Sequence, residues 1–247
     1  MELKYIRALG VELEGCWAKD QLVAWSHGGW PTALERAEVF TNRVGDGSVN
    51  SDGVPNPRNI GHTGEVNSSG LIKSVALMRL FIESAYPVYV NKSCGLHVHV
   101  SFAEDKGLGF VLNEDFWQDY QVAMRELADR VLEPDDQAMD WFDRRYEGGN
   151  QYCEPRWRPD YQLRSNDRGR YAHLNFCAIR KHGTLENRLF PMVNDAKMAA
   201  DLAAGYVEWL EGWLRERDTR PELEYNPEPV RVESAQRVNK SNLVLVA

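Results

Sequence analysis

The sequence predicts an α+β fold, and two observations carry this prediction. Strand-like alternation and helical periodicity occur in mixed order along the chain, without the regular strand–helix alternation that builds doubly wound or barrel folds. The composition is globular, with 43% hydrophobic and 27% charged residues among 247. We expect residues 1–217 to form a single domain. Residues 218–247, which become polar and proline-rich, are expected to form a C-terminal tail or a strap along the surface.

The first half of the chain contains two clear strand patterns and one helix pattern. Residues 8–14 alternate apolar and acidic side chains as a strand does. Residues 21–67 are rich in Gly, Pro, Asn and Ser, which predicts long loops with fragments of strand. Ser68 or Ser69 is expected to cap a helix that ends near residue 86. Residues 95–102 then alternate as a second strand.

The second half is richer in helix. Residues 113–133 and 135–142 are predicted to be helices, each capped by its first residue, an Asn and an Asp. Residues 171–179 and 184–190 are predicted to be two strands of a hairpin, joined by a tight connection. The pattern over residues 197–218 is the clearest helix in the chain, and its apolar stripe is expected to face the core.

Charge and cysteine usage limit the function classes. The 29 basic and 37 acidic residues give a net charge of −8, which argues against a generic nucleic-acid or membrane-surface binder. The charged N-terminus leaves no apolar core for a signal peptide, and no segment approaches the roughly 20 apolar residues that span a bilayer. The four cysteines form no CxxC pair and are expected to be reduced thiols in a cytoplasmic protein.

Charged side chains occur in pairs two residues apart on three predicted strands, and each pair therefore lies on one face of its strand. The pairs are Glu12 and Glu14, His97 and His99, and Glu186 and Arg188. Each pair alone is also compatible with exposed charges on a strand. Together, however, they supply the carboxylate and imidazole ligands of a divalent cation and a guanidinium for phosphate. Neighbouring carboxylates repel each other unless a cation lies between them, so we expect a metal site.

A wider set of segments, from Leu9 to Phe190, resembles the amidoligase family, the carboxylate–amine ligases with a glutamine synthetase-like catalytic fold. The segments are Gly10-Val11-Glu12-Leu13-Glu14, Asp46-Gly47-Ser48, Gly64-Glu65-Val66-Asn67-Ser68, Cys94-Gly95-Leu96-His97-Val98-His99-Val100, Arg170-Tyr171-Ala172-His173-Leu174-Asn175 and Gly183-Thr184-Leu185-Glu186-Asn187-Arg188-Leu189-Phe190. The resemblance implies a curved antiparallel sheet with helices packed on its convex face. It also implies ATP and two Mg²⁺ (or Mn²⁺) ions on the concave face, and a phage or mobile-element setting.

The resemblance also implies roles for individual residues. One metal site is expected to contain Glu12, His97 and Glu186, and the second to contain Glu14 and Glu65. His99 is expected near the nucleotide phosphates, and Arg188 and Arg170 at the transferred phosphoryl group. Less specific places in the cofactor site are implied for Asp46, Ser48 and Asn175.

The implied reaction joins a carboxylate to an amine through an acyl phosphate. The acid and the amine are open: small molecules, peptides, a protein side chain and a modified nucleobase are all compatible with the sequence, and so is any oligomeric state. The chain departs from the family at Asn187, where members generally carry an aromatic residue. Since Asn187 is offset by one residue from Glu186, it is expected on the opposite face, in the packing.

Two further functions stay open. The first is a metal-dependent hydrolase, because His97 and His99 followed by Glu104 imitate the first half of a cupin metal motif. The second is a non-catalytic binding protein that keeps the fold and offers tryptophans to a partner, with Trp17, Trp25, Trp30 and Trp157 as candidates. His27 and His182 are expected to lie outside the site.

Overall fold

The computed structural model describes residues 2–68, 71–164 and 169–219, and its centre is one antiparallel sheet. Within these described ranges six strands lie in the order β2-β3-β1-β4-β6-β5, and every neighbouring pair is antiparallel. Their bounds are β1 (Ile6–Ala18), β2 (Thr41–Val44), β3 (Ile60–Ser68), β4 (Gly95–Phe102), β5 (Leu174–Asn175) and β6 (Leu185–Pro191). Strands far apart in sequence thus become neighbours at the middle of the sheet.

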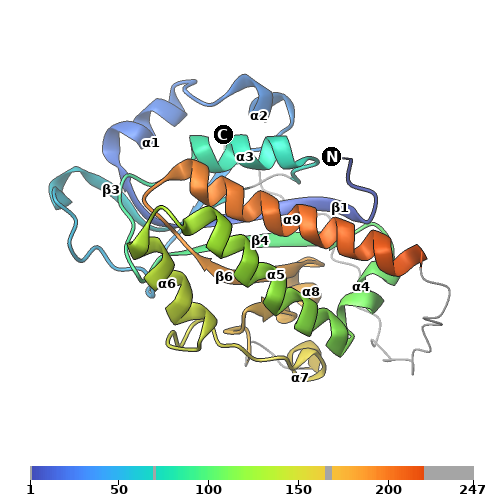
Figure 1. Cartoon of the computed structure of the whole chain (residues 1–247). Coiled ribbons are helices and arrows are strands. Elements are labelled where there is room, and N and C mark those ends of the chain that lie inside the picture. The colour runs from blue at the N-terminus through green and yellow to red at the C-terminus, as the bar shows by residue number, and fades with distance from the viewer. Residues whose placement is uncertain (1, 69–70, 165–168, 220–247) are drawn as a thin grey trace.

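Helices complete the fold and confirm the predicted α+β class. They are α1 (Lys19–Ser26), α2 (Thr32–Arg36), η1 (Pro57–Asn59), α3 (Val75–Ser84), α4 (Asp105–Val111), α5 (Glu114–Leu132), α6 (Asp136–Tyr146), α7 (Pro159–Arg164), α8 (Cys177–His182) and α9 (Ala196–Thr219). In Figure 1, α3, α9 and α5 run across one face of the sheet. Contacts of α3 with β1 and of α9 with β4 place these helices against the central strands.

Alternation along the strands separates the two faces of the sheet. Leu9, Val11 and Leu13 of β1 are buried among the core residues of the helix-covered face. Glu12 and Glu14 alternate with these residues along β1 and therefore lie on the other face. β4 and β6 follow the same rule, so an apolar face and a charged face are built from the same three strands.

The predicted hairpin between residues 171 and 190 is wrong in its first half. Only Leu174–Asn175 pairs with β6, and the chain then forms helix α8. The Asn175 side chain accepts a hydrogen bond from the Cys177 backbone amide at 3.0 Å, which turns the chain out of the strand. Gly183 ends α8 in the left-handed conformation, with φ of 69°.

One prediction about the first half also needs correction. α3 is capped by Ser74, whose side chain accepts a hydrogen bond from the Leu77 amide, and not by Ser68 or Ser69. Ser68 is instead the last residue of β3, and its hydroxyl accepts a hydrogen bond from the Val11 amide. Ser69 lies outside the described residues.

Elsewhere the helix predictions hold. Asn113 and Asp135 occupy the N-cap positions of α5 and α6, and the Asp135 side chain bonds the Ala138 amide. α9 covers the predicted helix. The expected tail lies outside the described residues from position 220 onward, so the domain boundary at 217 stays a prediction. Within the described ranges, no helix is long and apolar enough to cross a membrane.

The four tryptophans considered for a partner surface differ in their burial. Trp17 is fully buried and donates a hydrogen bond to the Ala85 carbonyl, and Trp30 is buried against Phe81. Trp25 and Trp157 are partly buried and pack against the core. Trp17 and Trp30 are therefore not available to a partner, whereas Trp25 and Trp157 keep part of their surface exposed.

Glu211 on α9 holds the beginning of β1, and its replacement is expected to destabilise the protein strongly. The fully buried carboxylate accepts hydrogen bonds from the backbone amides of Lys4 (2.8 Å), Tyr5 (3.0 Å) and Ile6 (3.1 Å). Glu211→Ala leaves these donors without an acceptor, so we expect a loss of about 3 kcal/mol or more in the free energy of unfolding. Urea denaturation measures this loss.

Glu208→Ala, at an exposed position on the same helix, is the control and should change the free energy of unfolding by less than about 0.5 kcal/mol. Equal effects of the two variants would contradict the role of Glu211.

Candidate active site

A cavity of about 520 Å³ lies on the charged face of the sheet. All the residues predicted for the site line it: Glu12, Glu14, Asp46, Ser48, Glu65, His97, His99, Arg170, Asn175, Glu186 and Arg188. They come from β1, β3, β4, β5 and β6 and from two connecting segments. The sheet order therefore brings together residues that are up to 176 positions apart, as Glu12 and Arg188 are.

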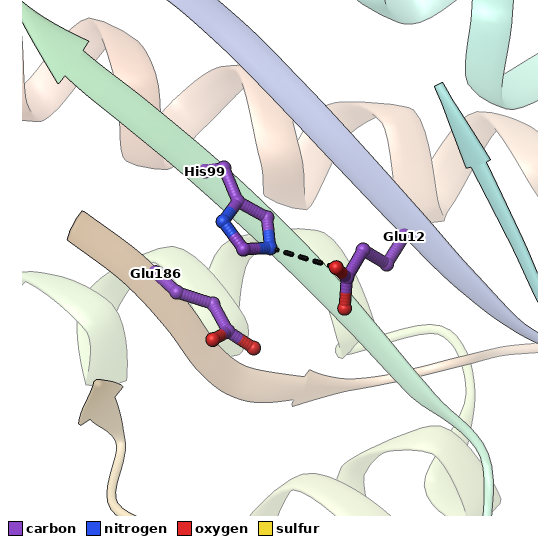
Figure 2. A group of neighbouring side chains, drawn as sticks. All are labelled: Glu12, His99 and Glu186. Atoms are coloured by element: carbon purple, nitrogen blue, oxygen red, sulfur yellow. Dashed lines mark ion pairs between the residues drawn. The ribbon is translucent and has the colours of Figure 1, made fainter. Parts of the chain in front are cut away.

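Glu12, His99 and Glu186 form a first group that can hold a metal ion. They project from the three adjacent strands β1, β4 and β6 toward one another (Figure 2). One ligand atom from each residue lies within 4.8 Å of the other two. Nε2 of His99 is 3.1 Å from Oε1 of Glu12. This group differs from the predicted one, which contained His97 and placed His99 at the phosphates.

Glu14, Asp46 and Glu65 form a second group with the same property. Glu14 and Glu65 are directly opposite each other on β1 and β3. Asp46 joins them from the segment after β2. The resemblance implied a less specific place in the cofactor site for Asp46 and did not include it among the metal ligands. Gly64 makes the approach of Asp46 possible: the glycine has a φ of 143°, and a Cβ there would lie 2.5 Å from the Val44 carbonyl oxygen.

His97 lies between the two groups. Its Nδ1 is 3.1 Å from Glu12 and 3.5 Å from Glu186, and its Nε2 is 3.6 Å from Glu14. Its side chain is only 2% exposed. The predicted triad of Glu12, His97 and Glu186 therefore does meet in space, and its histidine contacts a carboxylate of each group.

The crowded carboxyl groups change one another's acidity. Burial, the charge of Glu12 and a hydrogen bond to Asp46 raise the pKa of Glu65 to about 8. For Asp46, burial acts in the same direction, but hydrogen bonds from the backbone amide and hydroxyl of Ser48, both 2.7 Å long, lower its pKa below the usual value. Ionisation of Glu65 is thus unfavourable beside its acidic neighbours, and a bound divalent cation would favour its carboxylate form.

The first group is balanced by cationic neighbours. Burial raises the pKa of Glu186, but the charges of Arg188 and the two site histidines outweigh it and lower the pKa below its usual value. Burial lowers the pKa of His99, but the charges of Glu186 and Glu12 raise it above its usual value. In this arrangement Glu186 is held as a carboxylate.

Arg188 and Asn175 hold the Glu186 carboxylate from two sides. Arg188 forms an ion pair with Oε1, and the Asn175 amide donates a hydrogen bond to Oε2 at 2.6 Å. Asn175 was predicted to line a cofactor site; it lines the cavity, and its amide contacts a candidate metal ligand. Arg170, the other predicted arginine, lies over the ring of Tyr171, 4.8 Å from its centre, at the edge of the cavity.

The cavity also contains residues that the sequence patterns did not indicate. They include Ser93, Arg145, Tyr152, Tyr171, Lys181 and His182. The prediction that His182 lies outside the site is wrong, because its ring is 6.3 Å from that of His99. His182 was predicted to lie in the tight connection of a hairpin, and such a turn gives no reason to expect its side chains in the site. Buried Arg145 donates hydrogen bonds to the carbonyls of Cys94 and Arg188.

Asn187 lies on the helix-covered face, as predicted. Its side chain is buried and accepts a hydrogen bond from the Tyr120 hydroxyl of α5 at 3.0 Å. The departure from the family pattern therefore affects the packing of β6 against α5. It leaves Glu186 and Arg188 facing the cavity.

Other chemistry would need a further metal ligand beside the two histidines or an activated cysteine. Glu104 lines a separate cavity of about 110 Å³ with Lys106 and Asp218, so it does not complete a metal site with the histidines. All four cysteines are buried and form no disulfide with one another, and Cys177 lines the main cavity. Burial raises the pKa of Cys94 and of Cys153 to about 11, so neither is an activated nucleophile.

His173, which belongs to one of the family-like segments, supports the site in its neutral form. Its Nε2 lies 2.9 Å from the Arg145 carbonyl, and its Nδ1 lies 3.2 Å from the Gln121 amide nitrogen. Burial lowers the pKa of His173 to about 4. The ring therefore contacts the segment that carries Arg145 and does not face the cavity as a ligand.

The lowered pKa of His173 makes stability depend on pH. Histidine in an unfolded chain has a pKa of about 6.5, so between this pH and pH 4 the unfolded chain binds the proton and the folded chain does not. The free energy of unfolding should therefore fall as the pH decreases through this window, by up to about 3 kcal/mol from this residue. His173→Gln should show a smaller fall than the wild type in urea denaturation at pH 7 and pH 4.5. Parallel curves for the two proteins would contradict this role.

Comparisons with protein-family models, with curated proteins and with solved structures find no match to this chain.

Proposed function

We propose that this protein is an ATP-dependent carboxylate–amine ligase that uses two divalent cations and has a glutamine synthetase-like fold. One observation carries the proposal: two groups of metal-ligating side chains lie side by side on one sheet face, with His97 between them and Arg188 beside them. The family-like segments of the sequence support it, because all of them contribute residues to the same cavity or its supports.

The donor set fits hard divalent cations. Among the described residues, five carboxyl groups line the cavity, and Mg²⁺ and Mn²⁺ prefer such oxygen ligands. Glu12, His99 and Glu186, with His97 adjacent, would hold one ion, and Glu14, Asp46 and Glu65 the other. When bound, such ions neutralise the charge of phosphate oxygens during phosphoryl transfer.

The protein's own residues orient and neutralise the reactants. Arg188, fixed by Glu186, supplies a planar guanidinium to the transferred phosphoryl group, and Arg170 supplies a second one from the cavity edge. A substrate carboxylate oxygen bonds the γ-phosphorus and ADP leaves. The amine nitrogen then bonds the acyl carbon, loses a proton and displaces phosphate, which leaves an amide.

A metal-dependent hydrolase is the second candidate function, and the composition of the first group favours it. One imidazole with two carboxylates is also a ligand set for zinc, which activates bound water. The two reactions differ in their need for nucleotide, so one assay separates them.

The test is a screen of pooled carboxylates and amines with ATP and Mg²⁺. The ligase should form ADP only when both an acid and an amine are present, and mass spectrometry should find the amide. Omitting each component in turn is the control. A product formed without nucleotide would favour the hydrolase. If neither ADP formation nor thermal stabilisation by magnesium–nucleotide is found, the ligase proposal is refuted; at 100 times the dissociation constant the stabilisation should be about 2.7 kcal/mol.

A further inference from the structure

The His99 ring is held on three sides by residues outside the metal-ligating groups. Its Nδ1 lies 3.0 Å from the hydroxyl oxygen of Thr184. The ring of His182 meets it edge to face, at an interplanar angle of 86°. Gly10 is opposite it on β1, and a Cβ at Gly10 would lie 3.3 Å from Cβ of His99. The orientation of the ring is thus fixed by its surroundings.

The two nitrogens of this ring have different surroundings. Nε2 is buried and faces the first metal-ligating group, where it lies 3.1 Å from Oε1 of Glu12. Nδ1, in contrast, has the Thr184 hydroxyl as a partner. A neutral imidazole carries one proton, and the hydrogen bond at one nitrogen decides which nitrogen presents the lone pair.

We infer that Thr184 is a positioning residue for His99: its hydroxyl accepts the Nδ1 proton and leaves the Nε2 lone pair to a divalent cation held with Glu12 and Glu186. Metal-binding histidines generally donate their other ring N–H to such a partner, which fixes tautomer and orientation. The inference rests on the cation sites of the proposed function. The two sites also differ in their ligand types, since the first group offers an imidazole to cations such as Mn²⁺ and Zn²⁺, whereas the residues of the second group offer carboxylates.

Calorimetric titration with Mn²⁺ tests whether Thr184 strengthens cation binding by His99. Thr184→Val removes the hydroxyl at nearly constant volume and should weaken cation binding at the imidazole-containing site by about 10- to 100-fold. Thr184→Ser retains the hydroxyl and should restore the wild-type affinity. Thr41→Val, on β2 and outside the cavity, is the matched control and should bind Mn²⁺ as the wild type does.

Nitrogen NMR of ¹⁵N-histidine-labelled protein with saturating Zn²⁺ tests the tautomer itself, which a general loss of packing would not change. In the wild type and Thr184→Ser, Nδ1 of His99 should carry the proton and Nε2 the cation. Thr184→Val should populate the opposite tautomer, while circular dichroism confirms that it is folded.

Three results would overturn the inference: a wild-type His99 protonated at Nε2, a Thr184→Val variant with unchanged affinity and tautomer, or a wild type that binds neither Mn²⁺ nor Zn²⁺. The ligase proposal has a separate readout. A protein with the expected tautomer and affinities that forms no ADP with any acid and amine would refute the ligase and leave the role of Thr184 intact.

Discussion

Glu186→Gln is expected to reduce ATP-dependent ligation by about 1000-fold or more. Glu186 is buried, belongs to the first metal-ligating group and is the partner of Arg188. The amide keeps the shape of the side chain but removes its negative charge, so both the cation and the arginine lose their counter-charge. ADP formation under saturating substrates measures the effect, and titration with Mn²⁺ should show a weaker first site.

The fold should survive this change. Gln keeps one oxygen for Arg188, and the loss at Asn175 is a single hydrogen bond, so the free energy of unfolding should fall by no more than about 2 kcal/mol. Glu104→Gln, in the separate small cavity, is the matched control and should retain full turnover. A Glu186→Gln enzyme that turns over at the wild-type rate would show that the group has no catalytic role.

Arg188→Lys is expected to slow turnover by about 100-fold or more, although the positive charge is retained. The guanidinium pairs with Glu186 through one nitrogen, while its Nε is buried with no hydrogen-bond partner among the described residues. The charges of Glu186, Glu14 and Glu12 outweigh burial and raise the pKa of Arg188, so it stays charged. Lysine is a point charge and cannot bond Glu186 and a phosphoryl oxygen in one plane.

The measurement is kcat with ATP and saturating acid and amine. Because a lysine still compensates the Glu186 charge, stability and Mn²⁺ affinity should change little, and this separates a catalytic from a structural effect. Arg180→Lys, on the exposed side of α8, is the control. Near-normal turnover of Arg188→Lys would assign the arginine to structure alone.

The face of each strand could be predicted from the sequence because side chains alternate with a period of two. Glu12 and Glu14, His97 and His99, and Glu186 and Arg188 were placed on common faces by spacing alone, and the structure confirms that they line one cavity. Asn187 was placed correctly on the opposite face for the same reason.

Which residues form each of the two metal-ligating groups could not be predicted, because this depends on which strands become neighbours. Asp46 lies 19 residues before Glu65 in sequence and reaches it only because β2 pairs with β3 and Gly64 admits the connecting segment. Helix α8 was missed because residues 171–179 have the apolar character of a buried strand. Local hydrogen bonding of Asn175 decided the outcome.

By itself, the sequence determined the α+β class, the charged faces of three strands and the ligand types that they offer, since these follow from local periodicity. Only the tertiary structure decided that His99 joins Glu12 and Glu186, that Asp46 joins Glu14 and Glu65, and that Thr184 and His182 surround His99. These contacts depend on the strand order, on the register between strands and on the short helix α8. Strand order and register involve residues far apart in sequence and are decided by the packing of the whole core, which local patterns do not show.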